Sequence, residues 1–356
     1  MGRRIVVAMS GGVDSSVTAA LLKNDGWDVV GITLQLYKND QVIGRCCSSK
    51  DIYDARRVAD HLKIPHYVID YENTFRQDVI EQFIDSYLAG ETPIPCILCN
   101  QTVKFRDLFG IAHDLDAEAL ATGHYVRCEK VEGVTRMLRG VDHERDQSYF
   151  LFTTIREKLN FLRFPLGDIK SKNETRKIAK QYKLPVATKP DSQDICFVPD
   201  GNYASLIELL RPNSIKSGNI VHVDGRILGC HNGIIHYTVG QRKGLGLGGG
   251  EPLYVIQIDA IMHRVIVGPK EILIRAGVTL SGVNWLVEET SGINRVQVKI
   301  RSASEPIPAT LHQDDNGIFN VIFDRPKEGV TPGQACVFYD GELVLGGGWI
   351  KQAVNN

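Results

Sequence analysis

A short glycine turn near the amino terminus has the residue types that a phosphate site needs. The segment Ser10–Ser15 reads Ser-Gly-Gly-Val-Asp-Ser and follows an apolar run, Arg4–Met9. Glycines let the backbone approach an anion closely, and amides at a helix N-terminus then donate to it, aided by the helix dipole. The segment lacks the Gly-Lys-Ser/Thr of a Walker A loop. A plain strand–turn–helix with serine caps is the alternative to the phosphate site that we predict.

Three cysteines lie in segments typical of reactive thiols. Cys96 and Cys99 form a Cys-x-x-Cys pair in a proline-containing loop before a helix expected from Val103, and Cys196 ends a polar run. A helix N-terminus stabilises the thiolate of a nearby cysteine. The pair could also be half of a zinc site, but no second Cys-x-x-Cys or paired histidines follow at the usual spacing.

The other five of the eight cysteines suggest no chemistry. Cys128, Cys230 and Cys336 fall within strand patterns, so we interpret them as buried small side chains. Cys46 and Cys47 lie in a polar loop, and we assign them no role.

Strand and helix patterns alternate over the first 200 residues. Expected strands are Arg4–Met9, Val29–Leu34, His66–Asp70 and Ala117–Ala121, and expected helices are Asp51–Leu62, Thr74–Leu88 and Val103–Leu115. This alternation predicts an α/β domain with a parallel sheet covered on both faces. Such sheets bind ligands beyond the carboxyl ends of their strands.

The second half is rich in short strand patterns broken by Gly and Pro. They include Ile220–Val223, Ile234–Val239, Tyr254–Ile258, Val265–Val267, Val296–Ile300, Ala309–Leu311, Phe319–Phe323 and Ala335–Tyr339. Strands at this spacing indicate small β domains or barrels. We therefore predict a parallel-sheet domain over 1–204, a small central β-rich domain over 205–276 and a C-terminal β-barrel over 277–356.

Composition excludes several classes of protein. With 41 Lys+Arg against 42 Asp+Glu, the chain is not polybasic, although residues 151–190 hold ten Lys/Arg and three Asp/Glu. Such a segment is either a solvated helix face or a surface for the backbone of a polyanion. We expect no membrane association, because no apolar run approaches the ~18 residues of a membrane span. Without a signal-peptide pattern the expected compartment is the cytoplasm, where cysteines stay reduced.

Several segments, spread in order from residue 5 to about residue 350, together resemble the bacterial tRNA-specific 2-thiouridylase family of the N-type ATP pyrophosphatase superfamily. They are Ser10–Ser15, Pro93–Asn100, Ala121–Tyr125, Asp146–Phe150, Ser192–Phe197, His236–Gly246 and Thr331–Gln334. The resemblance covers nearly the whole chain.

The resemblance implies a reaction in which the C2 oxygen of the wobble uridine, position 34 of tRNA, is replaced by sulfur. ATP with Mg²⁺ transfers AMP to that oxygen and releases pyrophosphate, because the oxygen of a urea-like carbonyl is a poor leaving group. Sulfur arrives as a persulfide on Cys196, and Cys99 is the catalytic nucleophile, leaving a Cys99–Cys196 disulfide. The implied partners are tRNA and a sulfur donor, either a cysteine desulfurase or a sulfur-relay protein.

The family's functional positions map onto two groups of residues. The ATP-binding group is Ala8, Met9, Ser10, Gly11, Gly12, Val13, Asp14, Ser15, Leu34 and Gly123. The tRNA-contacting group is Ile94, Pro95, Cys96, His124, Arg145, Asp146, Gln147, Arg301, Ser302 and Gln334.

The chain departs from the family at two of these positions. Many members have Asp at the position of Cys96, so acid–base catalysis is not assigned there, and many have an aromatic residue at the position of Ser302, whose stacking on RNA is lost. Cys96, Cys99 and Cys196 could supply three thiolates to an iron–sulfur cluster. Apart from that hypothesis no metal ligand is predicted in the chain.

Two other functions remain open on sequence alone. Another N-type pyrophosphatase, such as an amide or lysidine ligase, would have no use for Cys99 and Cys196. A non-catalytic RNA-binding or metal-binding module would not release pyrophosphate from ATP when tRNA is added.

Overall fold

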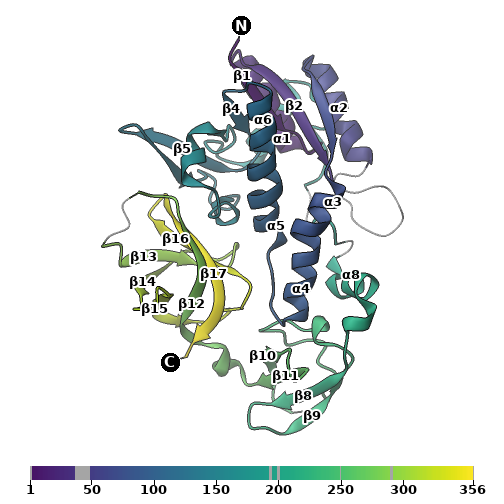
Figure 1. Ribbon diagram of the computed structural model, residues 1–356, viewed down its shortest axis with the longest axis vertical. Helices are drawn as coiled ribbons and strands as arrows, with labels where there is room; N and C mark the ends of the chain where they lie inside the picture. The colour runs from purple at the N-terminus through teal and green to yellow at the C-terminus, as the bar shows by residue number, and fades with distance from the viewer. Residues whose placement is uncertain are drawn as a thin grey trace.

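The computed structural model describes residues 2–36, 49–191, 195–198, 201–248, 250–288 and 292–355. Cys46, Cys47 and the motif residues 192–194 lie outside the described residues. The chain forms an N-terminal α/β part, a small central β part and a C-terminal barrel (Figure 1). The barrel and the central part lie on the same side of the N-terminal part.

The N-terminal part is built on a five-stranded parallel sheet of order β3-β2-β1-β4-β7. Its strands are β1 (Arg4–Ala8), β2 (Asp28–Gln35), β3 (His66–Asp70), β4 (Ala119–Ala121) and β7 (Leu162–Arg163). Successive side chains of β1 alternate between the faces, so Ile5 and Val7 pack in one apolar cluster and Val6 in another. The predicted parallel sheet is confirmed.

Helices cover both faces of this sheet. The cluster around Ile5 and Val7 includes side chains from α1 (Val13–Asn24), α2 (Ser49–Leu62) and α7 (Lys172–Gln181). The cluster around Val6 receives two other helical stretches, which are α3 (Glu72–Phe75) with η1 (Arg76–Glu81) and α4 (Gln82–Leu88), and α5 (Pro95–Leu98) with η2 (Cys99–Asp107) and α6 (Leu108–Asp114). The segments η1 and η2 are π-helical.

The central part contains a four-stranded sheet of order β10-β11-β8-β9. Its elements are α8 (Tyr203–Leu210), η6 (Pro212–Ser214), β8 (Gly218–His222), β9 (Ile227–His231), η7 (Ile234–His236), β10 (Tyr254–Asp259), β11 (Arg264–Gly268) and η8 (Lys270–Leu273). The predicted strand at Ile234–Val239 is wrong, because η7 is a 3₁₀ helix. Ile234 and Ile235 are both buried, but in different clusters, Ile234 in that of the central sheet and Ile235 in that around Val6.

The C-terminal part is a closed six-stranded antiparallel barrel. Its strands are β12 (Arg275–Trp285), β13 (Arg295–Lys299), β14 (Ile307–Gln313), β15 (Phe319–Lys327), β16 (Ala335–Asp340) and β17 (Leu343–Val354). Neighbours pair in the order β12-β15-β14-β13-β16-β17, and pairing of β12 with β17 closes the ring. The predicted barrel is confirmed.

A hairpin of the N-terminal part joins the barrel, a feature that sequence patterns missed. Strands β5 (Val126–Val131) and β6 (Val134–Arg139) pair with each other, and β6 pairs with β17 at Leu138 and Leu343. The cluster around Val6 also includes Ala335 and Val337 of β16. The N-terminal part and the barrel therefore share one core.

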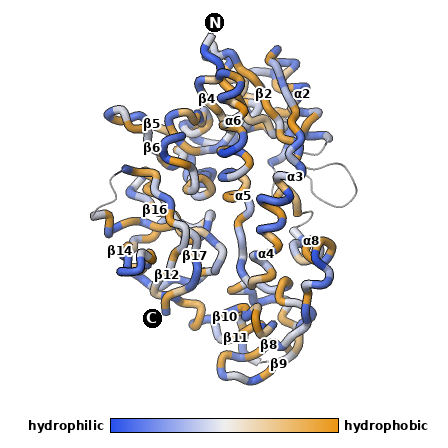
Figure 2. Tube along the Cα trace, viewed as in Figure 1, coloured by the Kyte–Doolittle hydropathy of each residue, from blue (hydrophilic) through white to orange (hydrophobic). Residues whose placement is uncertain are grey.

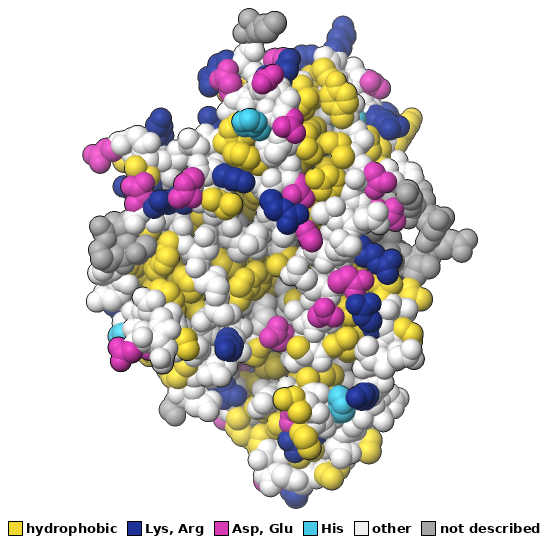
Figure 3. Space-filling view, viewed as in Figure 1, with side chains coloured by type: hydrophobic (Ala, Val, Ile, Leu, Met, Phe, Trp, Pro, Cys, Tyr) yellow, Lys and Arg dark blue, Asp and Glu magenta, His cyan; other side chains and the backbone are white. Residues whose placement is uncertain are grey.

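Surface and interior are separated as in an ordinary globular protein. Hydrophobic and hydrophilic segments alternate along the chain in all three parts (Figure 2). Lysine, arginine and acidic side chains are interspersed on the face drawn in Figure 3. Within the described residues, every helix is too short or too polar to cross a lipid bilayer.

The interpretation of three cysteines as buried strand residues is only partly confirmed. Cys336 is buried and Cys128 half-buried, but Cys230 is exposed. Cys230 lies on β9, at one edge of the central sheet, and its side chain faces Asn219 rather than the core.

Candidate active site

The glycine turn between β1 and α1 is held by its own hydroxyl groups. Ser15 Oγ accepts from Ser10 N at 3.1 Å, and Ser16 Oγ donates to Gly12 O at 2.7 Å. Gly12 is the N-cap of α1. Gly11 has φ +71°, and a Cβ there would lie 2.1 Å from Asp51 O. Only glycine fits at Gly11, because the turn passes directly against the start of α2.

A cavity of about 220 Å³ opens beside this turn and is lined by most of the predicted ATP-binding residues and by three others of the predicted site. The predicted residues that line it are Ala8, Met9, Ser10, Asp14, Ser15, Leu34, Cys99, Gly123, His124 and Gln147. Gly11, Gly12 and Val13 belong to the turn but do not line the cavity. Apolar walls come from Ile32, Leu36, Val103 and Leu108. A phosphate-type turn, apolar walls and a thiol therefore meet in one place.

A larger hollow of about 800 Å³ lies elsewhere on the N-terminal part, between Trp27 at the end of α1 and the β5–β6 hairpin. None of the predicted site residues lines it. The smaller cavity is the candidate site because the predicted functional residues line it, although the other hollow has the larger volume.

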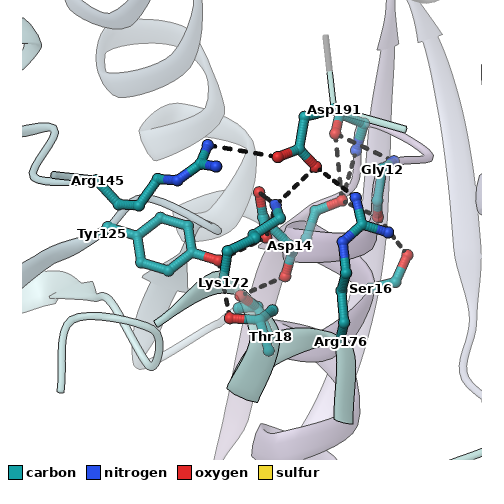
Figure 4. Close-up of polar contacts among 12 residues, drawn as sticks. Gly12, Asp14, Ser16, Thr18, Tyr125, Arg145, Lys172, Arg176 and Asp191 are labelled. Atoms are coloured by element: carbon teal, nitrogen blue, oxygen red, sulfur yellow. Dashed lines mark hydrogen bonds and ion pairs between the residues drawn. The ribbon is translucent and has the colours of Figure 1, made fainter. Parts of the chain in front are cut away.

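Asp14 is the centre of a network of charges at the start of α1 (Figure 4). Lys172 Nζ donates to both Asp14 oxygens at 2.7 and 2.8 Å, and the Tyr125 hydroxyl donates to Asp14 Oδ1 at 2.8 Å. Lys172 also pairs with Asp191 at 3.0 Å, and Arg176 and Arg145 pair with Asp191 at 3.0 and 3.4 Å. The network places three cations close to the turn.

A fourth cation approaches the turn from its other side. Lys189 Nζ donates to Gly11 O at 3.0 Å, to Asp51 at 2.6 Å and to Asp54 at 2.7 Å. The cations Lys172, Arg176 and Lys189 of the basic segment 151–190 thus face acidic groups beside the turn. Lys172, Arg176 and Lys189 therefore lie neither on a solvated helix face nor on a surface for RNA.

Cys99 begins the π-helical segment η2 and is buried at its N-terminal end. The helix starts at Pro95, earlier than the predicted Val103, and proline is favoured at a first helical position. Burial raises the pKa of the Cys99 thiol above its ordinary value, and the opposing effect of the Lys104 charge is smaller. Cys99 therefore lies one turn inside the helix and not at its N-terminus, where the sequence had suggested a thiolate-favouring position, and its burial disfavours the thiolate.

The raised pKa of Cys99 predicts a strong pH dependence of its reactivity. Since only the thiolate is nucleophilic, its alkylation rate should increase about tenfold per pH unit from pH 7 to beyond the pKa of an ordinary thiol. Mass spectrometry of iodoacetamide-treated protein measures this rate, with the exposed Cys230 as internal control. A Cys99 rate that levels off at lower pH than that of Cys230 would contradict the assignment.

His124 lines the cavity as a neutral ring. Its Nδ1 lies 2.8 Å from Thr122 Oγ1, and its ring contacts Phe105 and Phe164. Desolvation lowers the pKa of His124 well below its usual value, and the Lys104 charge acts in the same direction. His124 therefore supplies hydrogen bonds at neutral pH and carries no charge.

The other two cysteines of interest lie outside the cavity lining. Cys96 is exposed at the start of α5, and Cys196 is half-buried against the apolar cluster that contains Cys99. Among the described residues, no three His, Cys, Asp or Glu side chains are grouped so that they could hold a metal ion. Cys96, Cys99 and Cys196 thus do not form the three-thiolate set of the iron–sulfur hypothesis in this structure.

Residues predicted to contact tRNA occupy several environments. Ile94 is the N-cap of α5, and Pro95 is buried as its first residue. Arg301 and Ser302 are exposed on the barrel, where Arg301 donates to Gly329 O at 2.9 Å. Gln334 is half-buried and donates to Thr92 O at 2.7 Å.

Asp146 differs from the others because its carboxylate is fully buried. It accepts from Arg139 Nε, from the amides of Gly140 and Ser148, and from Ser148 Oγ. This carboxylate holds its own segment in place. Next to it, Gln147 exchanges two hydrogen bonds with the Tyr125 backbone, each 3.0 Å long.

Sequence reasoning missed Lys104, Tyr125 and Lys172. Lys104 lines the cavity on η2, and its charge affects both Cys99 and His124. A sequence signal exists for Lys172, because Ser171 and Glu174 form an N-terminal capping pattern in which Ser171 Oγ accepts from Glu174 N. That pattern places Lys172 in the first turn of α7.

Comparison with known families divides the chain as the fold does. Residues 3–200 match a model described as the tRNA methyl transferase HUP domain, residues 209–269 the tRNA methyl transferase PRC-barrel domain, and residues 275–350 the aminomethyltransferase beta-barrel domain. A tRNA-specific 2-thiouridylase MnmA from Paramagnetospirillum magneticum is 56% identical over 98% of this chain and 95% of its own length. The chain belongs to the tRNA-specific 2-thiouridylase family.

One further relative and one solved structure are also similar to this chain. The tRNA-specific 2-thiouridylase MnmA of Methylobacterium radiotolerans is also 56% identical, covering 98% of this chain and 94% of the relative. A 4-thiouridine synthetase solved with RNA and bound ATP covers 60% of this chain and 51% of its own, at 18% identity and a TM-score of 0.40. A likeness at that level says nothing about activity.

Proposed function

We propose that this protein uses ATP to replace the C2 oxygen of the tRNA wobble uridine, position 34, by sulfur. One observation carries the proposal, which is that Cys99 lines the same cavity as Ser10, Asp14 and Ser15 of the glycine turn. Phosphate binding and a thiol are the two requirements of an adenylation followed by sulfur transfer. An amide or lysidine ligase requires only the first.

In the proposed first step the uridine O2 attacks the α-phosphorus of ATP, and pyrophosphate leaves. The amides of the turn and the N-terminus of α1 would hold the departing phosphates, together with Lys172. Ala8, Met9 and Leu34 would bind the nucleoside, and Gly123 would let it pass close to α1. His124 and Gln147 would bind the uracil by hydrogen bonds.

In the proposed second step the terminal sulfur of a Cys196 persulfide attacks C2 of the adenylated uridine, and AMP leaves with the original oxygen. The Cys99 thiolate then attacks Sγ of Cys196, forming a Cys99–Cys196 disulfide and leaving the sulfur on C2. An external thiol reduces the disulfide, and a sulfur donor reloads Cys196. Cys99 belongs to the large cluster around Val6, and Cys196 packs against the same cluster.

Asp14 is suited to assist a magnesium ion bound to ATP. Mg²⁺ binds through substrate phosphates and one or two carboxylates rather than an all-protein cage, and the Asp14 carboxylate faces the cavity. The ion would neutralise charge on the leaving pyrophosphate. Lys172 already bonds both Asp14 oxygens, so it would share this carboxylate with the ion.

We also propose the setting in which the protein works. Ile94–Cys96, Arg145–Gln147, Arg301, Ser302 and Gln334 would contact the tRNA, and the sulfur donor would be a cysteine desulfurase or a relay protein. A tRNA substrate supports a cytoplasmic location. We propose 1–204, 205–276 and 277–356 as domain boundaries, with the β5–β6 hairpin as the part of the first domain that extends the barrel sheet.

The direct test incubates the purified protein with ATP, Mg²⁺, a sulfide source and tRNA, followed by nucleoside mass spectrometry. We expect 2-thiouridine at position 34 and tRNA-dependent release of pyrophosphate. Absence of both products would overturn the proposal, and pyrophosphate without thiouridine would favour a ligase.

Replacing Gly123 by alanine is expected to weaken ATP binding. The added Cβ would lie 2.8 Å from Ser15 N and 2.9 Å from Asp14 C, so either α1 or the β4 end must move. Overpacking of this kind should reduce affinity by about tenfold or more. Calorimetric titration with ATP measures it, and Gly110→Ala in α6, where nothing lies within 4 Å of the added Cβ, is the control. Unchanged affinity in Gly123→Ala would place the nucleotide elsewhere.

A further inference from the structure

Asn100, the residue after Cys99, is an amide buried in an apolar core. It is 2% exposed, and its Nδ2 donates to Phe150 O at 3.1 Å. Its Oδ1 has no hydrogen-bond partner among the described residues. Cys99, Val103 and Phe105 of the same helix pack in the surrounding cluster. Since an unsatisfied buried oxygen destabilises a fold, stability alone does not explain an asparagine at this position.

The Phe150 carbonyl, which accepts the hydrogen bond from Asn100, is held in place by contacts with the C-terminal barrel. Phe150 belongs to η3 (Ser148–Phe150), and Tyr149 beside it is fully buried. The Tyr149 hydroxyl donates to Ala335 O at 2.9 Å and accepts from Ala335 N at 3.2 Å. Ala335 is the first residue of β16. The position of Phe150 O, and with it the hydrogen bond to Asn100, depends on the barrel.

The same turn of the barrel holds the chain that leads into the Cys99 helix. Thr92 N donates to Pro332 O at 2.9 Å, and Gln334 Nε2 donates to Thr92 O at 2.7 Å. Gly333, with φ +85°, allows the close approach, because a Cβ there would lie 3.0 Å from Thr92 N. The barrel turn Thr331–Ala335 therefore contacts the chain before Cys99 directly and the chain after it through Tyr149 and Phe150.

We propose that the barrel turn Thr331–Ala335 positions Cys99 at the cavity, with Asn100 and Tyr149 as positioning residues. The inference rests on the proposed function, in which Cys99 is the nucleophile. Gln147, which precedes η3 and lines the cavity, is held separately by its two hydrogen bonds to the Tyr125 backbone, so the barrel turn acts on the thiol and not on the base-binding residue. The barrel contributes no residue to the cavity lining, but it takes part in catalysis because it positions Cys99.

Replacing Asn100 by leucine separates positioning from stability. Leucine has nearly the same shape; it removes the unsatisfied Asn100 oxygen but also leaves Phe150 O without its donor. Because these two effects on stability oppose each other, the melting temperature should stay close to that of the wild type. Freed from Phe150 O, the Cys99 helix should open more readily, and iodoacetamide should alkylate Cys99 at least ~5-fold faster. Sulfur transfer to adenylated tRNA should slow by ~10-fold or more, because a nucleophile must be held within about an ångström.

Tyr149→Phe is the second variant, since it removes only the hydroxyl that bonds Ala335. Tyr237→Phe is its matched control, because Tyr237 is a buried tyrosine of a different apolar cluster, that of the central sheet, and does not line the cavity. We expect Tyr149→Phe to reproduce the faster alkylation and slower sulfur transfer of Asn100→Leu, with ATP-dependent pyrophosphate release near the wild-type rate. We expect Tyr237→Phe to match the wild type in all three assays.

Wild-type rates of alkylation and sulfur transfer in both Asn100→Leu and Tyr149→Phe would overturn the positioning role. Failure of the proposed function is distinguishable from this outcome. It would appear as a wild-type protein that forms no 2-thiouridine, while the alkylation rates, which require no tRNA, still report on the position of Cys99.

Discussion

Serine in place of Cys99 is expected to reduce sulfur transfer to tRNA by about 10³-fold or more, while ATP-dependent pyrophosphate release continues. The reason is chemical, because breaking a sulfur–sulfur bond requires a thiolate, and a serine hydroxyl does not ionise at neutral pH. Adenylation uses the glycine turn and Asp14, which Cys99 does not contact through any of the hydrogen bonds described above. The two half-reactions should therefore separate in this variant.

Single-turnover assays with pre-loaded persulfide measure both half-reactions, with 2-thiouridine and pyrophosphate as products. The matched control is Cys230→Ser, because Cys230 is exposed on β9 and lies outside the cavity lining. Cys230→Ser should behave as wild type. If Cys99→Ser still yields 2-thiouridine at the control rate, Cys99 is not the nucleophile.

Cys196→Ser should abolish thiolation as well, but for a different reason. It should fail to carry a persulfide after incubation with a sulfur donor, whereas Cys99→Ser should still carry one at Cys196. Mass spectrometry of the loaded proteins distinguishes the two residues. A persulfide found on Cys99 in Cys196→Ser would reverse the roles assigned to the two thiols.

The glycine turn of the site could be predicted from sequence because its functional residues lie in one short segment. A glycine turn between an apolar run and a helix pattern has few physical alternatives, and parallel strands bring the ends of β1, β2 and β4 to one edge. The turn with Asp14 could be placed for that reason, whereas Leu34 and Gly123 were implied only by the family resemblance; all three residues line the cavity.

The helix containing Cys99 shows what local patterns miss. Two prolines suggested a stiff loop, yet Pro95 begins the helix, and Cys99 is buried one turn further on. Its raised pKa results from burial by residues distant in sequence, which no motif around Cys99 encodes. Burial depends on tertiary packing, so the sequence alone could not show that the thiolate of Cys99 is disfavoured.

The basic segment 151–190 shows that ligands cannot be predicted from charge alone, for the same reason. Ten cations over 151–190 suggested RNA as one possible ligand, but a charge count does not reveal the partner of each side chain. Lys172, Arg176 and Lys189 instead face Asp14, Asp191, Asp51 and Asp54. Only the fold brings α7 against α1 and α2, and that contact converts surface charge into part of the site.

Asparagine in place of Asp14 is expected to lower the rate of tRNA adenylation by about 10²-fold or more. Asn keeps the size of the side chain and can still accept a hydrogen bond from the Tyr125 hydroxyl. It loses the negative charge that holds Lys172 at 2.7 and 2.8 Å and that would assist the magnesium ion of ATP. Lys172 then keeps Asp191 as its partner and is drawn away from the start of α1.

Pyrophosphate release measures this effect, and Asp324→Asn is the matched control. Asp324 is also a carboxylate with a cationic partner, Arg295 at 2.7 Å, but on the barrel surface. Melting temperatures test whether Asp14→Asn remains folded, which we expect because Lys172, Arg176 and Arg145 still have Asp191 as a shared partner. Persulfide loading of Cys196 should be unchanged, since that step needs neither ATP nor the turn. Wild-type pyrophosphate release by Asp14→Asn would mean that the phosphates of ATP bind away from the start of α1.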